Sequence, residues 1–173
     1  MLLGAHLIFG NALILPLVEQ LALSGVEGPA GAFLLGVASH HLGDLLPHID
    51  SNLWPRDFND IRNWPRLLWA LFIVETLIGV LILLNFAPTF AGRWAIILAA
   101  GFGSLLPDLI SHTPIKYRLN RTNIGQMYLT FHKRFHFRVS GTRRSLKLAV
   151  AGVIELFVLA LSLLVLGSLP VSL

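Results

Sequence analysis

Long apolar stretches separated by short polar segments form the main pattern along the chain. Residues 94–106 carry no acidic or basic side chain. Residues 67–86 and 148–169 carry one carboxylate each. Stretches of about 17–25 apolar residues can cross a bilayer as helices. Together with residues 2–23 and 29–46, they predict an all-α protein, a polytopic membrane helix bundle of about five transmembrane helices. The chain is expected to form one domain over residues 1–173.

The first two stretches differ from the others because ionisable side chains interrupt them. His6 and Glu19 lie in residues 2–23, and His40, His41 and Asp44 lie in residues 29–46. Ionisable groups inside a membrane are costly, and in transmembrane segments they usually mark a functional site. The pattern therefore favours a bundle built around a polar site.

A short motif, Asp-Leu-(Leu/Ile)-x-His, occurs twice, each time at the end of an apolar stretch. One copy runs from Asp44 to His48 and the other from Asp108 to His112. Residues i and i+4 are neighbours on a helix, about 5–6 Å apart, so each pair is close enough to share a metal ion. His40, one turn before Asp44, extends the first copy. The candidate metal ligands are His6, His40, Asp44, His48, Asp108 and His112.

Two observations keep an alternative open for these residues. Polar side chains on neighbouring membrane helices can simply hydrogen-bond to one another and fix the packing. Pro47 lies inside the first copy of the motif, and a proline there can end or kink the helix. His48 is then expected just beyond the helix end.

Composition narrows the chemistry of the site. Apolar residues make up 55% of the chain and charged residues 13%, and there is no cysteine, which excludes disulfides and thiolate ligands. Imidazole and carboxylate ligands indicate zinc or manganese, and the number of candidates allows two ions. Glu75 and Glu155, each surrounded by apolar residues, and the i, i+4 pair His132 and His136 are candidate catalytic acids and bases.

The basic residues predict an orientation and a partner. Most of the 13 Lys and Arg residues lie between Lys116 and Lys147. Five helices would place residues 49–65 and 113–146 on the side of the N-terminus, which the positive-inside rule makes cytoplasmic. We therefore expect a bacterial or archaeal cytoplasmic membrane protein with a cytoplasmic N-terminus. Its basic loop 113–146, with a short helix at 123–134, is a candidate lid that faces anionic headgroups rather than nucleic acid.

Several short motifs resemble the membrane-bound metal-dependent hydrolase family of bacterial inner membranes. They are Gly-Ala-His-Leu-Ile-Phe at 4–9, Ser-His-His-Leu-Gly-Asp at 39–44, Leu-Leu-Pro-His-Ile-Asp at 45–50 and His-Lys-Arg-Phe-His at 132–136. The run at 40–44 is also similar to the His-x-x-Gly-Asp run of zinc-dependent phospholipase C. The motif order differs from the family's, and Leu-Leu-Pro-Asp at 105–108 lacks the family's second Asp. The resemblance implies an all-helical metallohydrolase that acts on a phosphoester of a lipid-like substrate.

Three functions fit this sequence. The first is the metal-dependent hydrolase, the second a metal or proton transporter that uses the same His and Asp residues, and the third a non-catalytic membrane scaffold. A transporter requires polar groups along the whole path across the bilayer. Beyond the cluster only Asn11 and Glu19 offer such groups, so the sequence favours the enzyme.

Overall fold

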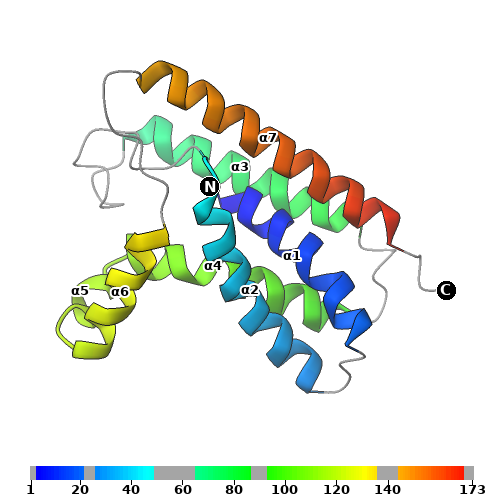
Figure 1. The fold of residues 1–173 in the computed structure, drawn as a ribbon, viewed down its shortest axis with the longest axis horizontal. Coiled ribbons are helices and arrows are strands. Elements are labelled where there is room, and N and C mark those ends of the chain that lie inside the picture. The colour runs from blue at the N-terminus through cyan, green and yellow to red at the C-terminus, as the bar shows by residue number, and fades with distance from the viewer. Residues whose placement is uncertain (1–2, 22–25, 49–64, 87–92, 136–143, 170–173) are drawn as a thin grey trace.

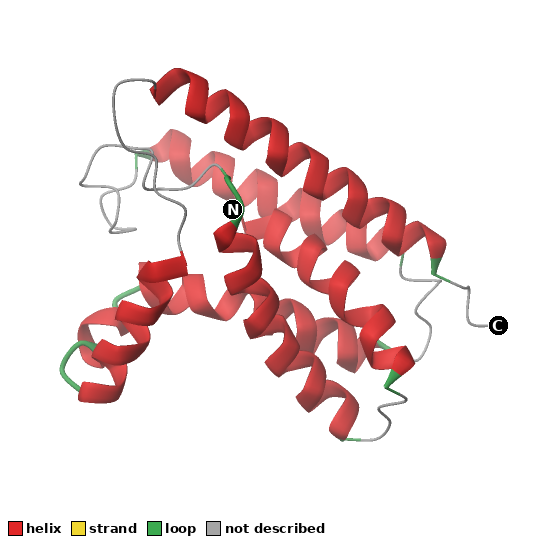
Figure 2. Ribbon diagram, in the orientation of Figure 1, coloured by secondary structure: helices red, strands yellow, loops and turns green. Residues whose placement is uncertain are grey.

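The computed structural model describes residues 3–21, 26–48, 65–86, 93–135 and 144–169, and within these ranges the chain is helical with no strand (Figures 1 and 2). The all-α prediction is confirmed for these residues. The helices are α1 (Leu3–Gln20), α2 (Glu27–Leu45), α3 (Arg66–Asn85), α4 (Trp94–His112), α5 (Ile115–Leu119), α6 (Asn123–Phe135) and α7 (Arg144–Ser168).

The five long helices coincide with the five predicted apolar stretches, but fewer of them have the character of membrane spans. Three described helical segments are long and apolar enough to cross a membrane: α1, α4 and residues Ser145–Ser168 of α7. The apolar part of α3, Trp69–Asn85, is shorter. Helix α2 carries Glu27, Asp44 and two histidines, which lower its hydropathy. The expected number of five spans is therefore reduced to three candidates.

The predicted basic loop is largely helical where it is described. Residues 113–135 contain α5 and α6, and α6 confirms the short helix expected at 123–134. The remainder of that loop, residues 136–143, lies outside the described part of the chain, as does most of the connector predicted at 49–65.

Helix α1 lies at the centre of the fold and packs against α2, α3, α4 and α7 (Figure 1). Its side chains Ile8, Ile14 and Leu15 are almost completely buried. In contrast, α3 and α7 leave much of their apolar surface uncovered. The exposed side chains include Leu71, Val74, Leu77, Leu81 and Leu84 on α3 and Val153, Leu156, Phe157, Leu161 and Leu164 on α7.

Helices α2 and α4 form the closest pair because glycines allow their backbones to touch. A Cβ atom built on Gly36 would lie 2.4 Å from the carbonyl oxygen of Ala100, and one on Gly103 would lie 2.3 Å from that of Phe33. Small residues permit such close approach between helices. The contact brings the C-terminal ends of α2 and α4, with their two Asp-containing motifs, to the same end of the bundle.

An ion pair joins the C-terminal end of α1 to the N-terminal end of α4. The guanidinium group of Arg93, just before α4, contacts the carboxylate of Glu19 near the end of α1. Because α1 and α4 are antiparallel, this pair lies far from the start of α1 and the end of α4. Those two ends carry His6 and Asp108.

Candidate metal centre

Helix α2 supplies two of the predicted ligands, His40 and Asp44, and the segment that follows it supplies a third, His48. The Nε2 atom of His40 lies 3.0 Å from Oδ2 of Asp44, one turn later. The helix ends at Leu45, as Pro47 predicted, so His48 lies beyond it. The His48 ring is held by its Nδ1–H, which donates to the carbonyl of Leu46 at 2.6 Å. This leaves its Nε2 3.9 Å from Oδ1 of Asp44.

Asp108 enters the same cluster from α4. Its Oδ1 lies 3.8 Å from Nε2 of His40 and 3.8 Å from Nε2 of His132, and its Oδ2 lies 3.9 Å from Nε2 of His6. His112 is at the edge of the cluster. Its Nδ1 is 3.7 Å from Oδ1 of Asp108 and also contacts the hydroxyl of Ser111. The two copies of the motif therefore meet in space.

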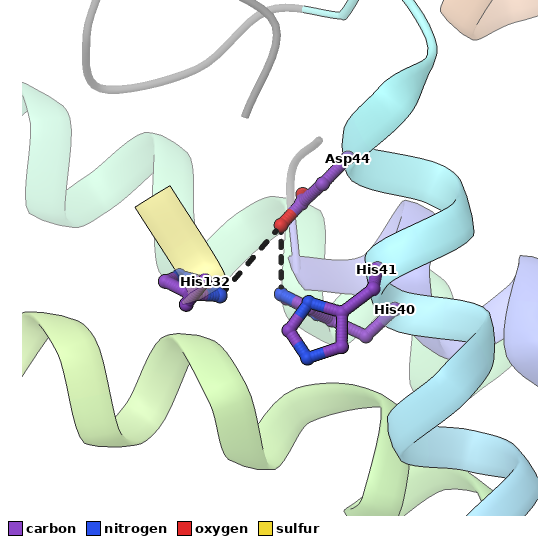
Figure 3. Close-up of side chains that lie close together, drawn as sticks. All are labelled: His40, His41, Asp44 and His132. Atoms are coloured by element: carbon purple, nitrogen blue, oxygen red, sulfur yellow. Dashed lines mark ion pairs between the residues drawn. The ribbon is translucent and has the colours of Figure 1, made fainter. Parts of the chain in front are cut away.

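Helices α1 and α6 complete the cluster with one histidine each. His6 of α1 stacks on the ring of His40, with centroids 4.2 Å apart, and its Nε2 lies 3.3 Å from Oδ1 of Asp44. His132 of α6 points toward Asp44, with its Nδ1 3.9 Å from Oδ2 of Asp44 (Figure 3). His6, His40, Asp44 and His132 are all at most 2% exposed. Residues from four helices thus converge on a largely buried cluster.

A hydrogen bond orients the ring of His40 as in a metal site. Nδ1–H of His40 donates to the carbonyl of Ser104 at 2.8 Å, which turns Nε2 toward the two carboxylates. Such a bond to the outer nitrogen is the usual way in which a metal-binding histidine is oriented. Nε2 of His40, both ring nitrogens of His6 and Oδ1 of Asp108 are buried without a hydrogen bond of normal geometry to any described residue. Buried polar atoms almost always have a partner, which can be a protein group, an ordered water or an ion, so these atoms are available to a metal ion.

The distances between the ligand atoms also fit a metal ion. In a tetrahedral zinc site with Zn–N bonds of about 2.0–2.1 Å, neighbouring ligand atoms lie roughly 3.3 Å apart. One group, His40, His41, Asp44 and His132, and a second, His6, His40 and Asp108, each place their ligand atoms within 4.8 Å of one another. These buried groups could hold a metal ion, and His40 belongs to both.

Three residues near the cluster were missed or undervalued in the sequence. His41, about 100° around the helix from His40, was not a predicted ligand, yet it packs edge-on against the rings of His40 and His132. Ser104 was missed, although its position one turn before Asp108 is a usable signal. Tyr128 of α6 stacks on His132. Its burial, with Asp108 and Asp44 nearby, raises the pKa of the Tyr128 hydroxyl to about 12.

The four candidate acids and bases have separate outcomes. His132 lies inside the cluster, and His136 lies outside the described residues. The carboxylate of Glu75 accepts the backbone N–H groups of Gly4 and Ala5, both at 2.9 Å, and so caps the first turn of α1. Glu155 is buried in α7. Among the described residues, the groups able to hold a metal ion include neither glutamate.

The position of Glu75 predicts a loss of stability when its side chain is removed. The first N–H groups of a helix have no partner within the helix. In Glu75→Ala we expect the free energy of unfolding to fall by about 1–3 kcal/mol, because buried N–H groups lose their acceptor. Glu75→Gln keeps one acceptor oxygen and should lose less. Thermal unfolding in detergent measures both, and equal stability of Glu75→Ala and the wild type would contradict this role.

The cluster combines imidazoles, carboxylates and an apolar enclosure, a combination suited to binding a divalent cation and activating water on it. No family model matches the chain, and neither a curated protein nor a solved structure is significantly similar to it. What can be concluded about its activity therefore rests on the geometry of this centre.

Proposed function

We propose that this protein is a membrane-bound metal-dependent hydrolase that cleaves a phosphoester of a lipid-like substrate. The observation that carries the proposal is the buried convergence of His6, His40, Asp44, Asp108 and His132 from four helices. Burying two carboxylates is costly unless cations compensate their charge. A divalent ion held among neutral imidazoles meets this requirement.

Membrane insertion is supported by the outer surface of the bundle. Helices α1, α4 and most of α7 are long and apolar enough to span a bilayer. Exposed leucine, valine and phenylalanine side chains cover α3 and α7, and soluble monomers rarely expose contiguous apolar surface of this kind. The basic residues of α5 and α6 lie at the end of the bundle that holds the cluster, and under the positive-inside rule this supports a cytoplasmic position for the cluster.

The donor set supports zinc or manganese, since it contains nitrogen and oxygen ligands and no sulfur. When bound, such an ion lowers the pKa of a coordinated water and polarises the phosphoryl oxygen. The protein holds the histidine rings in place, as His40 is held by Ser104. Both groups of ligand atoms include His40, whose Nδ1 is engaged by Ser104. Its Nε2 can bind only one ion, so a second ion would need ligands other than His40.

A phosphoester is the preferred substrate because basic side chains, which can bind a phosphate group, follow the candidate metal ligand His132 on α6. Lys133 and Arg134 are exposed and follow His132 directly. Arginine binds phosphate through paired charge-assisted hydrogen bonds. A substrate anchored in the bilayer reaches this end of the bundle at the level of its headgroup.

The transporter hypothesis receives less support from the packing. Asn11 is the next buried polar side chain on α1 beyond His6, and its amide already donates to the carbonyl of Leu7. Further along α1, Ile14, Leu15 and Val18 are buried and apolar. A hydrated path from the cluster to the other end of α1 would have to pass these side chains.

A substrate screen tests the proposed activity. Protein purified in detergent and loaded with zinc or manganese should hydrolyse at least one substrate among phosphomonoesters, phosphodiesters and phospholipids. Asp44→Asn should lower kcat/KM by at least about 100-fold, because even indirect partners of metal ligands matter 10–100-fold.

Glu19→Gln is the matched control, since it makes the same carboxylate-to-amide change at the far end of α1 and should retain activity. A metal-loaded protein that is inert on every phosphoester, while proteoliposomes conduct ions, would replace the hydrolase with the transporter.

A further inference from the structure

Helices α5 and α6 form a hairpin that projects from the end of α4 beside the cluster (Figure 1). Helix α6 has two contrasting sides. His132 is 2% exposed and points into the cluster, whereas Ile124 is 82% exposed and Met127 is 72% exposed. Large apolar side chains that are this open, on a helix with one buried polar anchor, indicate a second surface with its own partner.

The exposed apolar residues of α6 share one face. Ile124, Met127 and Phe131 are spaced i, i+3 and i+7, the spacing of one helical stripe. Phe131 contacts the ring of His41 on α2, with centroids 5.1 Å apart. Leu45, one turn after His41 on the same helix, is also exposed. The apolar face of α6 therefore begins beside the side of α2 that carries His41 and Leu45.

Charge identifies the chemistry of the partner. No Asp or Glu occurs between residues 109 and 154, whereas Arg118, Arg121, Lys133 and Arg134 are exposed on and beside the hairpin. A helix with an apolar face and basic flanks is typical of segments that lie in a membrane interface. Basic residues next to a membrane are attracted to anionic headgroups.

We propose that the α5–α6 hairpin docks on the surface of an anionic bilayer. Ile124 and Met127 then insert below the headgroups, and the neighbouring basic side chains contact lipid phosphates. The same helix presents His132 to the cluster, so docking brings the α6 side of the cluster close to the headgroup layer. This inference rests on the proposed function only in that the helices cross a bilayer, and it does not depend on metal chemistry.

The absence of cysteine in the chain makes a site-directed labelling experiment straightforward. Ile124→Cys and Met127→Cys are each modified with a spin label in the full-length protein, reconstituted at one copy per nanodisc containing phosphatidylglycerol. Collision accessibility to oxygen and to a water-soluble nickel complex should place both labels about 5–10 Å below the phosphates. Gln126→Cys, at an exposed polar position about 100–160° around the helix from the two labels, is the matched control and should remain in water.

The lipid and salt dependence completes the test. Nanodiscs of phosphatidylcholine alone, or high salt, should increase the accessibility of both labels to the nickel complex. The inference is overturned if the labels at 124 and 127 are as accessible to water as the label at 126. It is also overturned if they become protected only when two copies share a disc, which would make this face an interface between copies.

Metal content measured in the same samples separates the two proposals. Lipid protection of 124 and 127 in a protein that binds no metal would support docking and contradict the hydrolase. Bound metal in a protein whose labels are exposed to water would support the metal site and contradict docking.

Discussion

His40→Ala and Asp108→Asn should each abolish the stoichiometric binding of a divalent metal by the purified protein. Both residues provide buried ligand atoms that make no hydrogen bond of normal geometry to the described residues. His40→Ala removes a bond to the ion, and Asp108→Asn removes a negative charge that compensates the charge of the ion. We expect the affinity to fall by at least about 100-fold, since changes to the partners of ligands already cost 10–100-fold. Elemental analysis and competition with a chelator measure the effect.

A carboxylate remote from the cluster provides the control. Glu19→Gln removes one negative charge from the Arg93 ion pair and should leave the metal content unchanged. Wild-type protein that contains no metal, and acquires none when zinc or manganese is added, would instead identify the cluster as a hydrogen-bonded contact between helices. That result favours the scaffold hypothesis.

Gly36→Ala is expected to disrupt the contact between α2 and α4, and with it the cluster at the end of these two helices. The new Cβ would lie 2.4 Å from the carbonyl oxygen of Ala100, and backbone atoms cannot move aside as a side chain can. Overpacking of this kind typically costs about 1–3 kcal/mol of stability. The shift of α2 away from α4 should also separate His40 and Asp44 from Asp108. Thermal unfolding and metal content should therefore fall together.

The matched variant for this test is Gly167→Ala in α7. A Cβ on Gly167 would meet the ring of Phe86 at 3.8 Å, an ordinary contact, and alanine has the higher helix propensity. This variant should be at least as stable as the wild type and bind metal normally. Equal behaviour of the two glycine variants would show that the close α2–α4 contact is not what holds the cluster together.

The pattern of apolar and polar residues predicted the positions of the long helices and the spacing of ligands within a helix. Apolar stretches between polar breaks gave the positions of α1, α2, α3, α4 and α7, because burial or membrane insertion of a helix depends on local hydrophobicity. The spacing of His40 and Asp44 predicted one face of α2, and Pro47 predicted its end, which leaves His48 beyond the helix. These are relations between near neighbours, which the geometry of the helix dictates.

The roles of single residues depended on contacts between segments far apart in the chain. Glu75 was a candidate for catalysis, but its carboxylate caps α1, 70 or more positions away in sequence. His41 was placed on a side face of its helix, and the arrival of α6 made that face part of the cluster. Helical periodicity carries no information about which helix lies opposite a given face.

The sequence by itself therefore determined the helical class, the apolar character of the helices and the supply of histidine and carboxylate ligands without sulfur. Only the tertiary structure decided that Asp44 and Asp108 approach the same histidines, that His6 and His132 join them, and that Glu75 does not. The physical reason is that ligands i and i+4 are set by the helix, whereas ligands on different helices are set by packing. In this chain that packing depends on glycines such as Gly36 and Gly103, where the backbones of α2 and α4 meet.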